Sequence, residues 1–65
     1  MVKVGSVIVL SNNSELHVKN VWPIDEQSIR FESHEGIDYK VVLESSNLYV
    51  ETLDKSFTLD IISVS

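Results

Sequence analysis

The chain has 65 residues and no cysteine, 43 % of its residues are hydrophobic, and ten acidic against five basic side chains give a formal net charge of −5. This length allows one domain with a small core, and this hydrophobic content excludes a disordered chain. The lack of cysteine excludes disulfides and thiolate sites and favours a cytoplasmic location. The negative charge disfavours nucleic-acid binding. No apolar stretch is long enough to span a membrane.

Apolar and polar residues alternate in six segments that are separated by turn-forming residues, a period typical of strands with one buried and one exposed face. The predicted strands are Val2–Leu10, Glu15–Trp22, Ser28–Ser33, Ile37–Glu44, Asn47–Leu53 and Phe57–Val64. Their connections are too short for parallel crossovers. We therefore predict a single all-β domain over residues 1–65, an antiparallel meander of five to six strands that forms a barrel or a compact sandwich.

The first predicted strand departs from alternation, because the four residues from Val7 to Leu10 are all apolar. Gly5 is a natural place for a bulge that would change which residues face outward. Without that shift Val7 and Val9 face outward, and with it Ile8 and Leu10 do. Either way, an apolar pair remains on the outer face of this strand.

The second predicted strand should end at Pro23, because proline cannot donate a hydrogen bond to a neighbouring strand and restrains the residue before it. The connection that follows can hold one short helical turn around residues 23–27. Trp22, at the end of the strand, should be partly exposed, and such aromatic residues often anchor interfaces.

The third and fourth predicted strands alternate most clearly. Their apolar face consists of Ile29, Phe31, Ile37, Tyr39, Val41 and Leu43. The aromatic side chains of Phe31, Tyr39 and Phe57 are best explained as parts of the core.

The fifth segment, residues 47–55, can be a strand or a helix, because Tyr49, Leu53 and Phe57 also follow a helical spacing. Its β-branched and aromatic residues favour a strand. In a strand, Tyr49 is out of phase with the apolar residues on either side of it and should be exposed.

The last strand again places apolar residues on both faces, at Ile61, Ile62 and Val64. In a closed meander it lies beside the first strand, so we predict an outer apolar stripe that joins two such chains as a homodimer, unless a loop covers it. The predicted interface residues are Val7, Val9, Trp22, Tyr49, Ile62 and Val64.

Candidate chemistry is sparse in this chain. His17 alternates with apolar neighbours and belongs to the polar face of its strand, whereas His34 lies in a tight turn beside Glu35, with Asp38 nearby. Their spacing matches no zinc or calcium signature, and none of the ten serines lies in a nucleophile elbow. We therefore expect no enzymatic activity, no metal site and no cofactor.

These observations favour a small, acidic protein-interaction module. One concrete form is a stoichiometric inhibitor of a larger host protein, of the anti-defence or nucleic-acid-mimicking kind that phages encode, because surplus acid can occupy a basic surface. The alternatives are a subunit of a structural homo-oligomer and a small barrel that binds single-stranded nucleic acid through exposed aromatic side chains.

Overall fold

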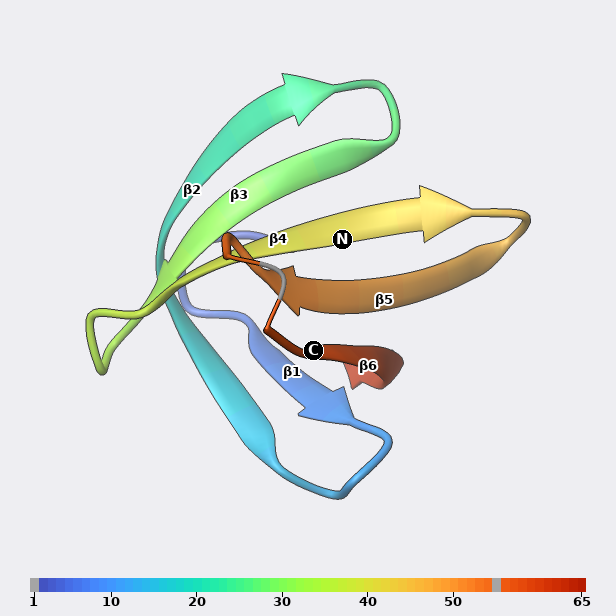
Figure 1. The fold of residues 1–65 in the computed structure, drawn as a ribbon. Helices are drawn as coiled ribbons and strands as arrows, with labels where there is room; N and C mark the ends of the chain where they lie inside the picture. Colours follow the sequence, from blue (N-terminus) through green and yellow to red (C-terminus); the bar gives the residue numbers. More distant parts are fainter. Residues whose placement is uncertain (1, 55) are drawn as a thin grey trace.

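The structure, a computed structural model that describes residues 2–54 and 56–65, contains six antiparallel strands closed into a small barrel (Figure 1). The strands are β1 (Val7–Leu10), β2 (Glu15–Asp25), β3 (Ser28–Ser33), β4 (Asp38–Glu44), β5 (Asn47–Thr52) and β6 (Thr58–Val64). Each strand pairs with the next in the sequence, and β1 also pairs with β6. The predicted antiparallel meander is confirmed, and its form is the barrel. Segment 47–52 is a strand and not a helix.

Two of the connections use the same turn. In the β1–β2 connection, the Asn13 amide donates to the Leu10 carbonyl (2.8 Å), and in the β3–β4 connection the Gly36 amide donates to the Ser33 carbonyl (2.9 Å). Asn13 and Gly36 both have positive φ, 68° and 82°. Three-residue hairpin loops end in this left-handed conformation, which glycine and asparagine adopt at least cost.

The β4–β5 connection is a two-residue turn in which Ser45 and Ser46 both have positive φ, 51° and 69°. Two consecutive residues of this kind indicate the type I′ turn that matches the twist of a hairpin. Serine lacks the freedom of glycine there, so this turn is strained.

The first strand begins later than predicted, at Val7. The Ser6 amide donates to the Lys3 carbonyl and the Lys3 amide to Ser6 Oγ, both at 2.9 Å, and Gly5 has a φ of 89°. Gly5 lies in this turn, and Gly5 and Ser6 together face Val18, because the Gly5 amide donates to the Val18 carbonyl and the Val18 amide to the Ser6 carbonyl, both at 2.9 Å. The bulge predicted at Gly5 is therefore present, just before β1. The faces expected with that bulge are not found, because Ile8 is buried and Val7 faces outward.

The second strand does not end at Pro23 but continues to Asp25. The helical turn predicted around residues 23–27 is therefore wrong, and the chain reverses at Glu26 and Gln27 instead. The reason is that β1 pairs with β2 only from Glu15 to His17, which leaves the later part of β2 as an edge. Proline is tolerated at an edge because no second neighbour needs its missing amide proton.

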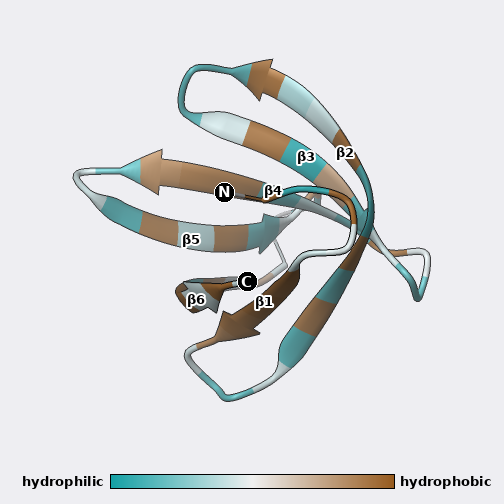
Figure 2. Cartoon of the chain, turned by 180° about the vertical axis from the view of Figure 1, so that it is seen from behind, coloured by the Kyte–Doolittle hydropathy of each residue, from teal (hydrophilic) through white to brown (hydrophobic). Residues whose placement is uncertain are grey.

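The core is formed by the inward face of the barrel. Its buried hydrophobic residues are Ile8, Leu10, Leu16, Val18, Phe31, Tyr39, Val41 and Val50. Tyr39 stacks on Phe31 with 5.2 Å between ring centroids and meets the edge of Phe57 at 6.1 Å, which confirms the predicted aromatic core. Figure 2 shows alternating hydropathy along β2 and β5 and an apolar β1.

Candidate functional site

One end of the barrel opens into an apolar hollow of about 260 Å³, which we call the mouth. It lies where the β2–β3 and β4–β5 hairpins meet the segments that contain Val2 and Val64. Its lining residues are Val2, Asp25, Glu26, Gln27, Ser28, Ile29, Val41, Leu43, Leu48 and Val64.

The walls of the mouth are aliphatic. Leu43 and Leu48 are cross-strand partners on β4 and β5, and they remain 44 % and 38 % exposed although they are in phase with buried Val41 and Val50. Their side chains therefore continue the inward face past the point where the core ends. Such a continuation leaves apolar surface in contact with water.

The rim of the mouth is acidic at the β2–β3 turn. Asp25 Oδ1 accepts hydrogen bonds from the Gln27 amide (2.8 Å) and from Ser28 Oγ (2.9 Å). The bond from Gln27, followed by the bond from Ser28, lowers the pKa of Asp25, and the field of Lys40 adds the smallest contribution. The Gln27 carbonyl in turn accepts from the Leu43 amide (2.8 Å), which fixes this turn to the wall of the mouth.

The predicted outer stripe is formed only in part. Val9 pairs with Ser63 and Leu10 with Ile61, so that a bulge leaves Ile62 between these pairs and 61 % exposed beside the outward-facing side of β1. Val64 pairs with buried Ile8 and packs against the core. Its assignment to the outer stripe is wrong, because the bulge changes the phase of β6. The stripe therefore consists of Val7 and Val9, whose partners are Ser65, just after β6, and Ser63, and of Ile62 at the bulge next to Val9.

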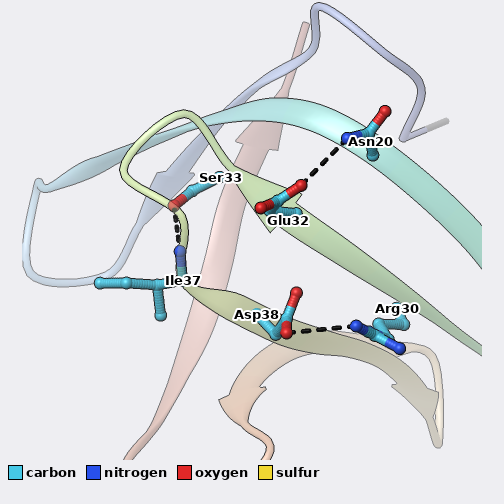
Figure 3. A network of polar contacts seen from close by, with 6 residues as sticks. All are labelled: Asn20, Arg30, Glu32, Ser33, Ile37 and Asp38. Carbon is cyan, nitrogen blue, oxygen red and sulfur yellow. Dashed lines mark hydrogen bonds and ion pairs between the residues drawn. The ribbon is translucent and has the colours of Figure 1, made fainter.

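Trp22 lies apart from that stripe, on the part of β2 that pairs only with β3. It is 42 % exposed, as predicted, and the Arg30 guanidinium lies 4.8 Å from its ring centroid. Arg30 also donates from Nη2 to Asp38 Oδ2 at 3.2 Å (Figure 3). The Asp38 carboxylate therefore offsets the charge of the Arg30 guanidinium beside Trp22. The surface around Trp22 is not a basic platform for nucleic acid.

Tyr49, the last predicted interface residue, lies on the outer face of β5 opposite Val42 and is half-buried. Its hydroxyl donates to Glu44 Oε2 at 3.5 Å, and its pKa is raised, mainly by burial and then by the field of Glu44. The six predicted residues are therefore distributed over several parts of the surface, and only the stripe forms a group.

A second hollow, of about 340 Å³, lies at the other end of the barrel. It brings together the two histidines, because the His34 amide donates to the His17 carbonyl (3.1 Å). Glu15 and Glu35 line it as well, and Glu15 Oε1 lies 3.5 Å from His17 Nε2. Among residues 2–54 and 56–65, however, no group of three or more histidine or acidic side chains is arranged to hold a metal ion.

The fold defines this chain as a small closed antiparallel β-barrel. Comparisons with protein-family models, with curated proteins and with solved structures found no significant match. Within the described residues no helix is long and apolar enough to cross a membrane.

Sequence reasoning missed the mouth, because its residues come from segments distant in the sequence. One signal was present: Leu43 and Leu48 stand two residues before and two after the Ser45–Ser46 turn. Large apolar residues so close to an exposed turn indicate surface that the core cannot cover.

Proposed function

We propose that this protein is a non-enzymatic protein-interaction module that binds a partner at the mouth. The observation that carries the proposal is the exposure of the inward-facing pair Leu43 and Leu48 around an apolar hollow. Apolar surface with a polar rim is a feature of protein-interaction sites and ligand-binding grooves. An anchoring side chain that fills a central pocket supplies much of the affinity in such interfaces.

The size of the mouth fits a single side chain of a protein partner. An apolar cavity of about 150 Å³ is sufficient for benzene, so a hollow of about 260 Å³ admits one large side chain. Sites for drug-sized ligands occupy roughly 300 to 1,000 Å³ and enclose most of the ligand.

The polar groups at the mouth support a binding role over a catalytic one. The Ser28 hydroxyl donates to Asp25, and the same carboxylate oxygen accepts from a backbone amide. The low pKa of Asp25 makes it a weak base. These groups hold the turn in place, and they do not form an activated nucleophile with a base that is oriented by a third group.

The test is capture of protein partners from a bacterial lysate with wild type and with Leu48→Asp. The matched control is Leu53→Asp, which changes another exposed leucine, 50 % exposed against 38 % for Leu48, that does not line the mouth. We expect wild type and Leu53→Asp to capture the same protein and Leu48→Asp to lose it while its circular dichroism spectrum is unchanged. Unchanged capture by folded Leu48→Asp would contradict the proposal.

A second candidate function is self-assembly, and the exposure of Ile62 at the bulge next to Val9 favours it. Chromatography with light scattering would measure the mass of the particle. A dimer that Ile62→Asp converts to a folded monomer supports an interface at the stripe. A wild-type monomer at all concentrations removes this candidate.

A further inference from the structure

We propose that the partner presents to the mouth a projecting basic segment, with one large apolar side chain in the hollow and a lysine or arginine beside it on Asp25 and Glu26. This inference rests on the proposed function and specifies the chemistry of the partner. Three features of the described residues carry it: the charge of the rim, the position of its carboxylates and the shape of the hollow.

The charge of the rim has one sign. Asp25 and Glu26 line the mouth, and every other lining residue is uncharged. The whole chain has a net charge of −5, so its overall field adds to that of the rim. A cation next to an apolar group therefore complements both parts of the mouth.

The Asp25 carboxylate is held in position before any partner arrives. Oδ1 accepts both of its internal hydrogen bonds, from Gln27 and Ser28, and among the described residues Oδ2 accepts none. The turn is tied to β4 by the bond between the Gln27 carbonyl and the Leu43 amide. One carboxylate oxygen thus serves the fold and the other can accept from an external donor, at little further cost in side-chain entropy.

The shape of the mouth favours a projecting segment over a flat surface. Leu43 and Leu48 form a wall, with Val41 below them toward the core. A hollow between hairpins is filled only by a group that protrudes, such as a side chain on a loop or at a chain end. The volume limits the inserted group to about one leucine or phenylalanine side chain.

The test uses four blocked heptapeptides with untagged, isotopically labelled protein and follows amide chemical shifts. The first peptide has a central leucine between lysines, the second replaces the lysines by serines, the third replaces them by glutamates, and the fourth has lysines around a central alanine. We expect the first to shift the amides of Gln27, Leu43 and Leu48 and to bind about tenfold more tightly than the second. The third and fourth should not bind measurably.

The variants Asp25→Asn and Glu26→Gln should each weaken binding of the first peptide about two- to fivefold, as expected for exposed charge pairs. Added salt should weaken it as well. Glu35→Gln, at the other end of the barrel, is the matched control and should leave the affinity unchanged. Asparagine keeps a side-chain oxygen for the internal donors, so Asp25→Asn tests charge and not folding.

Equal affinity for the lysine and serine peptides, or no effect of Asp25→Asn, would overturn the basic character of the partner. No shift at the mouth with the lysine peptide would overturn the inference as a whole. Lysate capture that folded Leu48→Asp loses would still support the proposed function in either case, so the two failures are distinguishable.

Discussion

At one end of the barrel the ring of Tyr39 packs against those of Phe31 and Phe57, whereas at the other end Leu43 and Leu48 lie side by side along one wall of a hollow. Both ends are made by the same strands, with the same antiparallel pairing. Hydrogen bonds close the sheet, but side-chain volume decides whether the interior is filled. Aromatic side chains fill the interior at one end of this small barrel, where the hollow that remains is lined by polar side chains, and aliphatic side chains leave an apolar hollow at the other.

The largest expected effect comes from emptying the aromatic end. Phe31 is fully buried, so Phe31→Ala should lower the free energy of unfolding by about 3 to 5 kcal/mol. This loss is a large part of the whole free energy of unfolding of a domain of this length, because that free energy is typically about 0.05 to 0.15 kcal/mol per residue. Thermal unfolding followed by circular dichroism measures the loss, and a melting temperature near that of wild type would show that the ring is not essential to the core.

A leucine at the mouth should matter less to stability than a smaller residue of the core. Leu48→Ala should cost about 1 kcal/mol or less because Leu48 is 38 % exposed, whereas Val50→Ala on the same strand should cost about 2 kcal/mol because Val50 is fully buried. Urea unfolding of both variants gives the two values. The reverse order would mean that the mouth is closed in solution.

The turns also differ in strain between the two ends of the barrel. Replacing Ser45 and Ser46, at the mouth end, by asparagine and glycine should raise the free energy of unfolding by about 1 kcal/mol, because these residues tolerate positive φ. Gly36→Ala, at the other end, should lower it by a similar amount through φ alone, because an added Cβ meets no atom within 4 Å. Urea midpoints with an unchanged denaturant slope check both changes. A destabilised Asn-Gly variant would contradict the assigned turn type.

The smallest expected effect is a dependence of stability on pH. The pKa values of Asp25, at the mouth, and of Asp54, in the β5–β6 connection, are both lowered, mainly by hydrogen bonds from Gln27 and from Thr52 respectively. The unfolded chain therefore binds more protons in acid, so this stabilisation is present above the unfolded pKa of about 3.8 and is lost as pH falls through the lower folded pKa.

Asp25→Asn and Asp54→Asn should each make the loss of stability in acid shallower. Asparagine still offers an oxygen to the same donors but does not titrate in this range. Urea midpoints measured from pH 7 down to pH 2 follow the loss. If neither variant changes the slope, other carboxylates are responsible for the acid response.

The bounds of the strands that follow Pro23 could be predicted from alternation to within one residue, and so could the aromatic core. The alternation of apolar and polar residues predicts which face of the sheet a side chain lies on only where the register between the paired strands is constant. The bulge at Ile62 broke that condition and moved Val64 to the inner face. Pro23 was misread because its effect depends on whether a second neighbour pairs with that part of the strand.

The candidate site was less accessible to sequence reasoning than the fold. The exposure of Trp22 and of Ile62 could be anticipated from their positions in the pattern. The mouth depends on how the two hairpins and the two chain ends assemble, and the meeting of His17 with His34 depends on the pairing of β2 with β3. No local pattern encodes such meetings.

Val2 and Val64 both line the mouth, so the first and last described segments lie close together at the same opening. An affinity tag fused to either terminus would emerge beside the hollow and compete for it. A label is better attached in the β1–β2 turn, at exposed Asn12, which lies among polar residues at the other end of the barrel.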